Sequence, residues 1–97
     1  MRYRIELSSS RNGFARVEVP NRVFEVEADE HIGPVWRVKL TDPSAARSGA
    51  VTVCADSAND AAWRVARAAV RAVSELTGSP IEGGLNSDTR EPSDNSR

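Results

Sequence analysis

The chain has 97 residues and a formal net charge of −1, with 39% hydrophobic and 28% charged residues. This length provides one modest hydrophobic core and excludes a two-domain enzyme with an interdomain cleft. The near-neutral charge excludes a strongly basic nucleic-acid-binding domain, and the single cysteine excludes an internal disulfide bond.

The apolar residues are too scattered along the chain to form a membrane segment. No run approaches the roughly 20 consecutive apolar residues that span a bilayer. Residues 1–10 alternate charged and apolar side chains and contain no apolar stretch typical of a signal peptide. We therefore expect a cytoplasmic protein with no membrane partner.

Apolar and polar residues alternate with a period of two through the first half of the chain. This pattern indicates antiparallel strands with one buried and one solvated face. The predicted strands cover residues 2–7, 14–19, 23–28, 35–40 and a shorter stretch at 50–55. Their inward-facing residues include Tyr3, Ile5, Leu7, Ala15, Val17, Val19, Phe24, Val26, Ala28, Trp36, Val38 and Leu40. Asn12 and Gly13 form a strong turn signal between the first two strands, and we interpret residues 29–34 and 41–49 as loops.

A single amphipathic helix is predicted over residues 56–76. Asp56 or Ser57 can cap its first turn, Asp60 follows Ser57 by three residues, and Gly78 can end the helix. The apolar face predicted at helical spacing consists of Ala62, Val65, Ala66, Ala69, Val73 and Leu76, with Trp63 and Val70 at its edge. Such a face allows the helix to pack on a sheet.

These elements predict an α+β fold. We expect a four- to five-stranded antiparallel sheet with one long helix packed on one face. Residues 1–78 form this single domain. Residues 79–97 are rich in Ser, Gly, Pro, Asn and Asp, a composition that predicts a disordered polar tail.

Catalytic and metal-binding residues are scarce. The one histidine, His31, and the one thiol, Cys54, are the only candidate nucleophile–base pair, and no sequence motif surrounds them. A structural zinc site needs four well-spaced Cys or His ligands, and no glycine-rich phosphate loop is present. We therefore expect neither catalysis nor a metal or cofactor.

Two groups of charged residues are candidate binding surfaces. The acidic group comprises Glu18, Glu25, Glu27, Asp29 and Glu30, and the basic group comprises Arg64, Arg67 and Arg71 on the helix. The acidic group could complement a basic groove that normally holds a phosphate backbone, or it could simply prevent aggregation between strand edges. The arginines could bind nucleic acid, but Asp60 and Glu75 lie at i,i+4 spacing from Arg64 and Arg71, as on an ordinary solvated helix face.

Two resemblances bear on function. The stretches "MRY" and "GFARVEVP", with the helix start "ADSANDAAWRVARAAV", resemble HicB-type antitoxins, although the chain inserts "VFEVEADEHIGPVWRVKL" and has a polar tail in place of a DNA-binding motif. In size, α+β elements and acidic residues, the chain is also similar to phage and mobile-element inhibitors of the anti-CRISPR type. That second resemblance implies a protein that occupies a surface of a host complex.

The sequence thus predicts a non-catalytic binding protein. The favoured partner is a protein or ribonucleoprotein complex of the host, which an anti-CRISPR-like protein would block through the acidic residues. The alternative is a small RNA- or DNA-binding module, or a HicB-like antitoxin, that uses the helix arginines. An exposed edge strand could also pair with a target or with a second copy.

Overall fold

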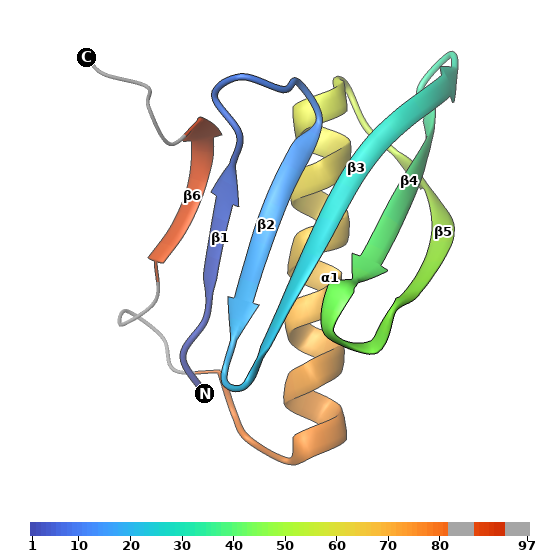
Figure 1. The fold of residues 1–97 in the computed structure, drawn as a ribbon. Coiled ribbons are helices and arrows are strands. Elements are labelled where there is room, and N and C mark those ends of the chain that lie inside the picture. Colours follow the sequence, from blue (N-terminus) through green and yellow to red (C-terminus); the bar gives the residue numbers. More distant parts are fainter. Residues whose placement is uncertain (82–86, 93–97) are drawn as a thin grey trace.

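The computed structural model describes residues 1–81 and the backbone of residues 87–92, and it shows a mixed sheet with one helix (Figure 1). The elements are β1 (Arg4–Leu7), β2 (Phe14–Val19), β3 (Arg22–Ile32), β4 (Val35–Asp42), a short 3-10 helix (Pro43–Ala45), β5 (Arg47–Cys54), α1 (Ala58–Thr77) and β6 (Ser87–Pro92). The sheet order is β5-β4-β3-β2-β1-β6. Strands β1 to β5 are antiparallel to their neighbours, which confirms the predicted fold class.

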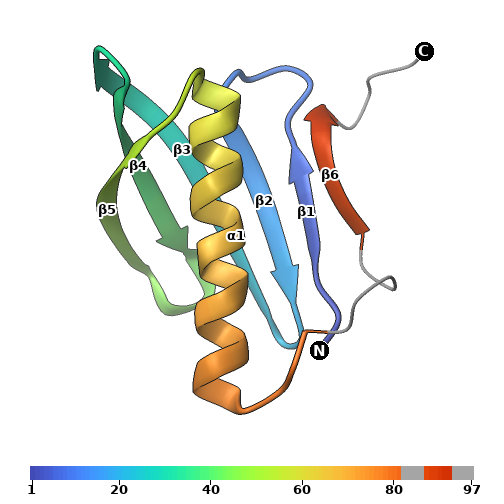
Figure 2. The same ribbon diagram turned by 180° about the vertical axis from the view of Figure 1, so that it is seen from behind.

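Helix α1 covers one face of the sheet and leaves the other open to solvent (Figure 2). It packs mainly on β2 and β3. The core lies between these layers, and Ile5, Val17, Val26 and Val38 are completely buried there. The alternation seen in the sequence therefore predicts the buried face of β1 to β4 correctly.

The helix begins and ends close to its predicted limits. The Asp60 backbone N–H donates to Ser57 Oγ at 3.1 Å, and Gly78 ends the helix with a φ of 71°. The prediction that Leu76 packs on the sheet is wrong, because this side chain is 85% exposed. The last turn of α1 extends beyond the ends of the strands (Figure 2), and Leu76 borders an open hollow of about 410 Å³ beside Val19 and Pro20.

Strand β3 is longer than its sequence pattern predicts. The expected loop over residues 29–34 is wrong, since β3 continues to Ile32, and only Gly33 and Pro34 form the turn before β4. The pairing register shifts between Ala28 and Glu30. A bulge of this kind breaks the period-two alternation by one residue, which explains why the pattern ends too early.

The connection between β4 and β5 is shorter than the predicted loop over residues 41–49. Asp42 ends β4 and caps the 3-10 helix, and β5 already begins at Arg47. The Ser44 hydroxyl donates to the Asp42 carboxylate at 2.7 Å, and this hydrogen bond lowers the pKa of Asp42 below its usual value. The Arg22 guanidinium, 3.9 Å from the same carboxylate, acts in the same direction.

Gly13 joins the β1–β2 turn to the start of the helix. Its N–H donates to Asn59 Oδ1 at 2.7 Å, and its carbonyl accepts from the Ala28 N–H at 2.8 Å. Its φ is 79°, and a Cβ at this position would lie 2.8 Å from the Ala58 Cβ. Only glycine allows the turn, β3 and α1 to meet so closely.

Part of the predicted polar tail belongs to the sheet. Residues 87–92 form β6, which runs parallel to β1 at one edge, so the sheet extends past the predicted domain boundary at residue 78. The rest of the predicted tail after residue 81, residues 82–86 and 93–97, lies outside the described residues. In the part of the chain that the structure describes, no helix has both the length and the apolar character of a membrane span.

Candidate binding surfaces

The central glutamates of the acidic group lie on the outer face of the sheet, opposite α1. Glu18, Glu25 and Glu27 alternate with the buried residues of β2 and β3. Each of them faces a cation on the neighbouring strand. These cross-strand pairs are Arg4–Glu18, Arg16–Glu25 and Lys39–Glu27. The outer face is therefore a lattice of alternating charges rather than a uniformly acidic patch.

Ion pairs further compensate two of these glutamates. Arg16 Nε lies 3.4 Å from Glu18 Oε2, and Arg11 forms an ion pair with Glu27. All of these side chains are partly exposed, so each pair is worth at most about 1 kcal/mol. The pairs matter here because they reduce the negative potential that a basic partner would encounter.

The other two acidic residues, Asp29 and Glu30, follow Glu27 along β3 at the bulge, where Glu30 takes the next position opposite Arg37. Glu30 pairs with Arg37 at 3.7 Å. Asp29 is exposed and forms no ion pair with the described residues. The predicted acidic group thus continues along β3 toward the hairpin, and a cation faces each of its glutamates.

The tip of this hairpin exposes apolar side chains. Ile32 and Val35 face each other across the Gly33–Pro34 turn, and they are 87% and 43% exposed. With Glu30, Arg37 and Thr52 they line a shallow hollow of about 210 Å³, which His31 also borders. Figures 1 and 2 show that the tip projects away from the first turn of α1. We call Glu30, Ile32, Val35, Arg37 and Thr52 the hairpin surface.

An aromatic stack supports the hairpin from its other side. The His31 and Trp36 rings are stacked with centroids 4.2 Å apart and an interplanar angle of 22°. Trp36 shares the helix-facing side of β4 with the buried Val38, so the stack lies behind the hairpin surface. The sequence interpretation missed this arrangement, although Ile32 and Val35 flanking a Gly-Pro pair are a signal for a tight hairpin.

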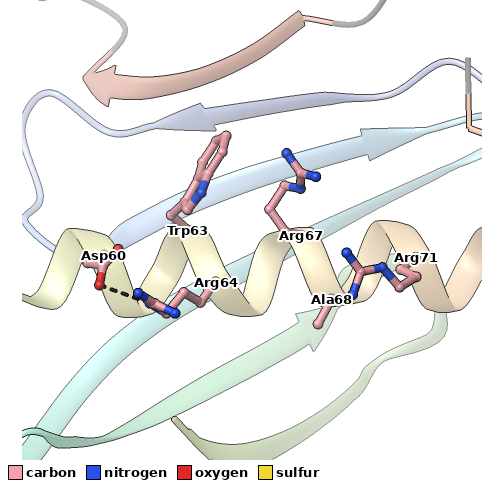
Figure 3. Close-up of a pocket in the computed structure, with 6 residues that line it drawn as sticks. All are labelled: Asp60, Trp63, Arg64, Arg67, Ala68 and Arg71. Carbon is pink, nitrogen blue, oxygen red and sulfur yellow. Dashed lines mark hydrogen bonds and ion pairs between the residues drawn. The ribbon is translucent and has the colours of Figure 1, made fainter. Parts of the chain in front are cut away.

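The three helix arginines surround a second hollow, of about 350 Å³, on the exposed face of α1 (Figure 3). Arg64 Nε donates to the Asp60 carboxylate at 2.9 Å, and this hydrogen bond raises the pKa of Arg64. The Arg67 guanidinium lies 5.7 Å from the centroid of the Trp63 ring. Asp60 thus compensates Arg64 as predicted.

The predicted partnership between Arg71 and Glu75 is absent. Both side chains are exposed, and no ion pair joins them in the described structure. Trp63, which the sequence interpretation placed at the edge of the buried face, borders the arginine hollow. The basic group therefore borders a hollow together with an aromatic ring, whereas a cation faces each glutamate of the acidic group.

The structure does not bring the candidate catalytic pair together. Trp36, directly opposite His31, also faces Val53 on β5, whereas Cys54 faces Val35 on the opposite side of the sheet. His31 and Cys54 therefore occupy opposite faces, with β4 between their strands. Among the described residues, no three His, Cys, Asp or Glu side chains come close enough to hold a metal ion.

Comparisons with protein-family models, curated proteins and solved structures found no match to this chain. Its function must therefore be argued from its own surfaces.

Proposed function

We propose that this protein is a non-catalytic binding protein that occupies the surface of a macromolecular partner with its β3–β4 hairpin. The observation that carries this proposal is the exposure of Ile32 and Val35 at a projecting tip. An exposed isoleucine gains nothing for folding, whereas clustered apolar side chains with a polar rim are typical of protein-binding sites. Burying them against a partner would remove this apolar area from water.

The chemistry of the hairpin surface favours a protein partner. Its one cation, Arg37, already pairs with Glu30, so the surface offers little to a phosphate backbone. Asp29, which forms no ion pair with the described residues, lies beside the apolar tip and suits a partner pocket with a basic rim. Such pockets occur on complexes that bind nucleic acid. This supports the more specific proposal of a phage or mobile-element inhibitor, anti-CRISPR-like, that blocks a host nucleic-acid-binding complex.

A second candidate function uses the arginine hollow. Arg64, Arg67 and Arg71 meet beside Trp63, and cations next to an aromatic ring can bind single-stranded nucleic acid. This RNA- or DNA-binding module ranks second because Asp60 occupies the same hollow and the chain as a whole carries a net charge of −1.

Capture of partners from a host lysate can test the proposal. The tagged full chain is compared with Ile32→Asp, which places a charge at the hairpin tip, and with Leu76→Asp as the matched control. Ile32 and Leu76 are 87% and 85% exposed and lie in different parts of the molecule. We expect the wild type and Leu76→Asp to retain the same host protein and Ile32→Asp to lose it. Equal retention by all three chains would contradict the proposal.

A gel shift with RNA and DNA at low salt separates the two functions. The hairpin proposal expects no binding. Tight binding that weakens with salt and disappears in Arg71→Ala would replace it with the nucleic-acid-binding function.

A further inference from the structure

Strand β5 forms an unprotected edge of the sheet. Among the described strands it pairs only with β4, through eight consecutive residue pairs without a register shift. Edge strands usually avoid pairing with other chains by means of prolines, bulges or several charges. Within Arg47–Cys54 the only charged residue is Arg47, and there is no proline. The free backbone groups of β5 are therefore available to another strand.

The helix-facing side of β5 is apolar and incompletely covered. Val51 lies opposite the buried Val38, and Val53 lies opposite Trp36. Val51 is nevertheless 48% exposed, because α1 packs mainly on β2 and β3. A strand added beside β5 would shield Val51 and continue the apolar layer.

The charges at the two ends of β5 indicate what the added strand is. Arg47 begins the strand, and Asp56 follows shortly after its end; both side chains are exposed. If two copies of β5 pair antiparallel about Val51, the Arg47 of each copy lies opposite the Ala55 of the other, one residue from its Asp56. Parallel pairing would instead place like charges together. The strand is therefore complementary to itself in the antiparallel direction.

We propose that two copies of this chain form a dimer through antiparallel pairing of β5 about a two-fold axis at Val51. This register places Val51 opposite the partner's Val51 and Gly49 opposite the partner's Val53. In this register the two Val51 side chains contact each other, because directly facing residues lie on the same side of a sheet. A shift centred on Ala50 would instead place Arg47 against the partner's Val53.

The symmetry of this dimer determines how its surfaces are presented. A two-fold axis perpendicular to the sheet keeps both helices on one face of a continuous sheet. Both hairpin surfaces then lie on the opposite face, and the two hairpin tips project in opposite directions along the strands. The dimer does not depend on the proposed function, but it would allow two-point attachment to a partner with repeated sites.

A charge exchange tests the proposed contact. In sedimentation across a wide concentration range we expect the wild type to form a species of twice the chain mass of 10.5 kDa. Arg47→Glu and Asp56→Lys should each shift the equilibrium toward monomer, and the double variant should restore the dimer. Arg71→Glu on the helix is the matched control and should leave the dimer unchanged. A chain that stays monomeric, or a dimer indifferent to these exchanges, would overturn the proposal.

Disulfide trapping tests the register. In a Cys54→Ser background, Val51→Cys places two thiols opposite each other, and directly facing residues have Cα atoms about 4.5–5.5 Å apart, within disulfide range. We expect mild oxidation to give a covalent dimer with Val51→Cys but not with Thr52→Cys, whose symmetry mate is displaced along the strand. Circular dichroism establishes that both variants fold. Equal cross-linking of the two variants, or none with Val51→Cys, would overturn the register and the contact.

Discussion

The two halves of the sheet differ in how they meet the helix. On β1 and β2, Ile5 and Val17 are completely buried, whereas on the same, helix-facing side of β5, Val51 is 48% exposed. A helix is about 10 Å wide and strands are about 4.8 Å apart, so one helix covers only two or three strands. A six-stranded sheet with one helix must therefore leave part of itself uncovered. The covered half provides stability, and the uncovered half is available for binding.

The same substitution in the two halves gives the largest expected contrast. Ile5→Ala removes a completely buried side chain and should lower the free energy of unfolding by about 2–5 kcal/mol. Ile32→Ala, at an 87% exposed position, should change it by less than about 0.5 kcal/mol. Urea denaturation measures both. Similar losses for the two variants would show that the hairpin tip is part of the core.

Two glycines provide the next contrast. Gly13→Ala should cost roughly 2–4 kcal/mol, because it adds both left-handed backbone strain and a clash with Ala58. Gly33→Ala carries only the strain, since nothing lies within 4 Å of its added Cβ, and should cost about 1–2 kcal/mol. Thermal and urea unfolding report the difference. If Gly33→Ala proves the more costly, the packing role of Gly13 is wrong.

The start of α1 should contribute a smaller amount to the covered half. Ser57→Ala removes the acceptor for the Asp60 N–H and should destabilise the chain by about 1 kcal/mol. Ser9→Ala, exposed in the β1–β2 turn, is the matched control and should be nearly neutral. If urea denaturation gives Ser57→Ala the same free energy of unfolding as the wild type, packing alone positions α1.

The smallest effect is expected in the uncovered half, at Asp42. Because the pKa of Asp42 is lower in the folded chain than its usual value of 3.8, its stabilisation is present above that value and is lost as the pH falls through the folded-state pKa. Asp42→Asn should therefore be slightly less stable than the wild type at pH 7 and should approach it in acid. Urea denaturation at several pH values checks this. A difference that grows in acid would contradict the assigned hydrogen bonds.

The sequence predicted those parts of the fold that depend on neighbouring residues, namely the buried faces of strands and the ends of the helix. The buried face of β2, the Ser57 cap and the Gly78 stop follow from side-chain period and end chemistry, and all three are confirmed. The continuation of β3 past Ala28 was missed because a bulge changes the period. The strand β6 was missed because its residues have a loop-like composition and depend on β1 for their pairing.

The candidate sites were harder to predict because they depend on cross-strand neighbours. The sequence shows Glu18, Glu25 and Glu27 close together along the chain, but only the register shows a cation facing each of them. The opposite holds for Ile32 and Val35, which matter because no element covers them. The exposure of a side chain on the outer face of the sheet is a tertiary property that no short stretch of sequence encodes.

We propose that the projecting β3–β4 hairpin, and not the helix, contacts the partner. Amide hydrogen exchange of the chain alone and in its captured complex tests this most directly, because it locates the contact without substitutions. We predict slower exchange concentrated in residues 29–37, with the exposed face of α1 unchanged. Protection over residues 60–71 with an unprotected hairpin would contradict the account and favour the arginine hollow.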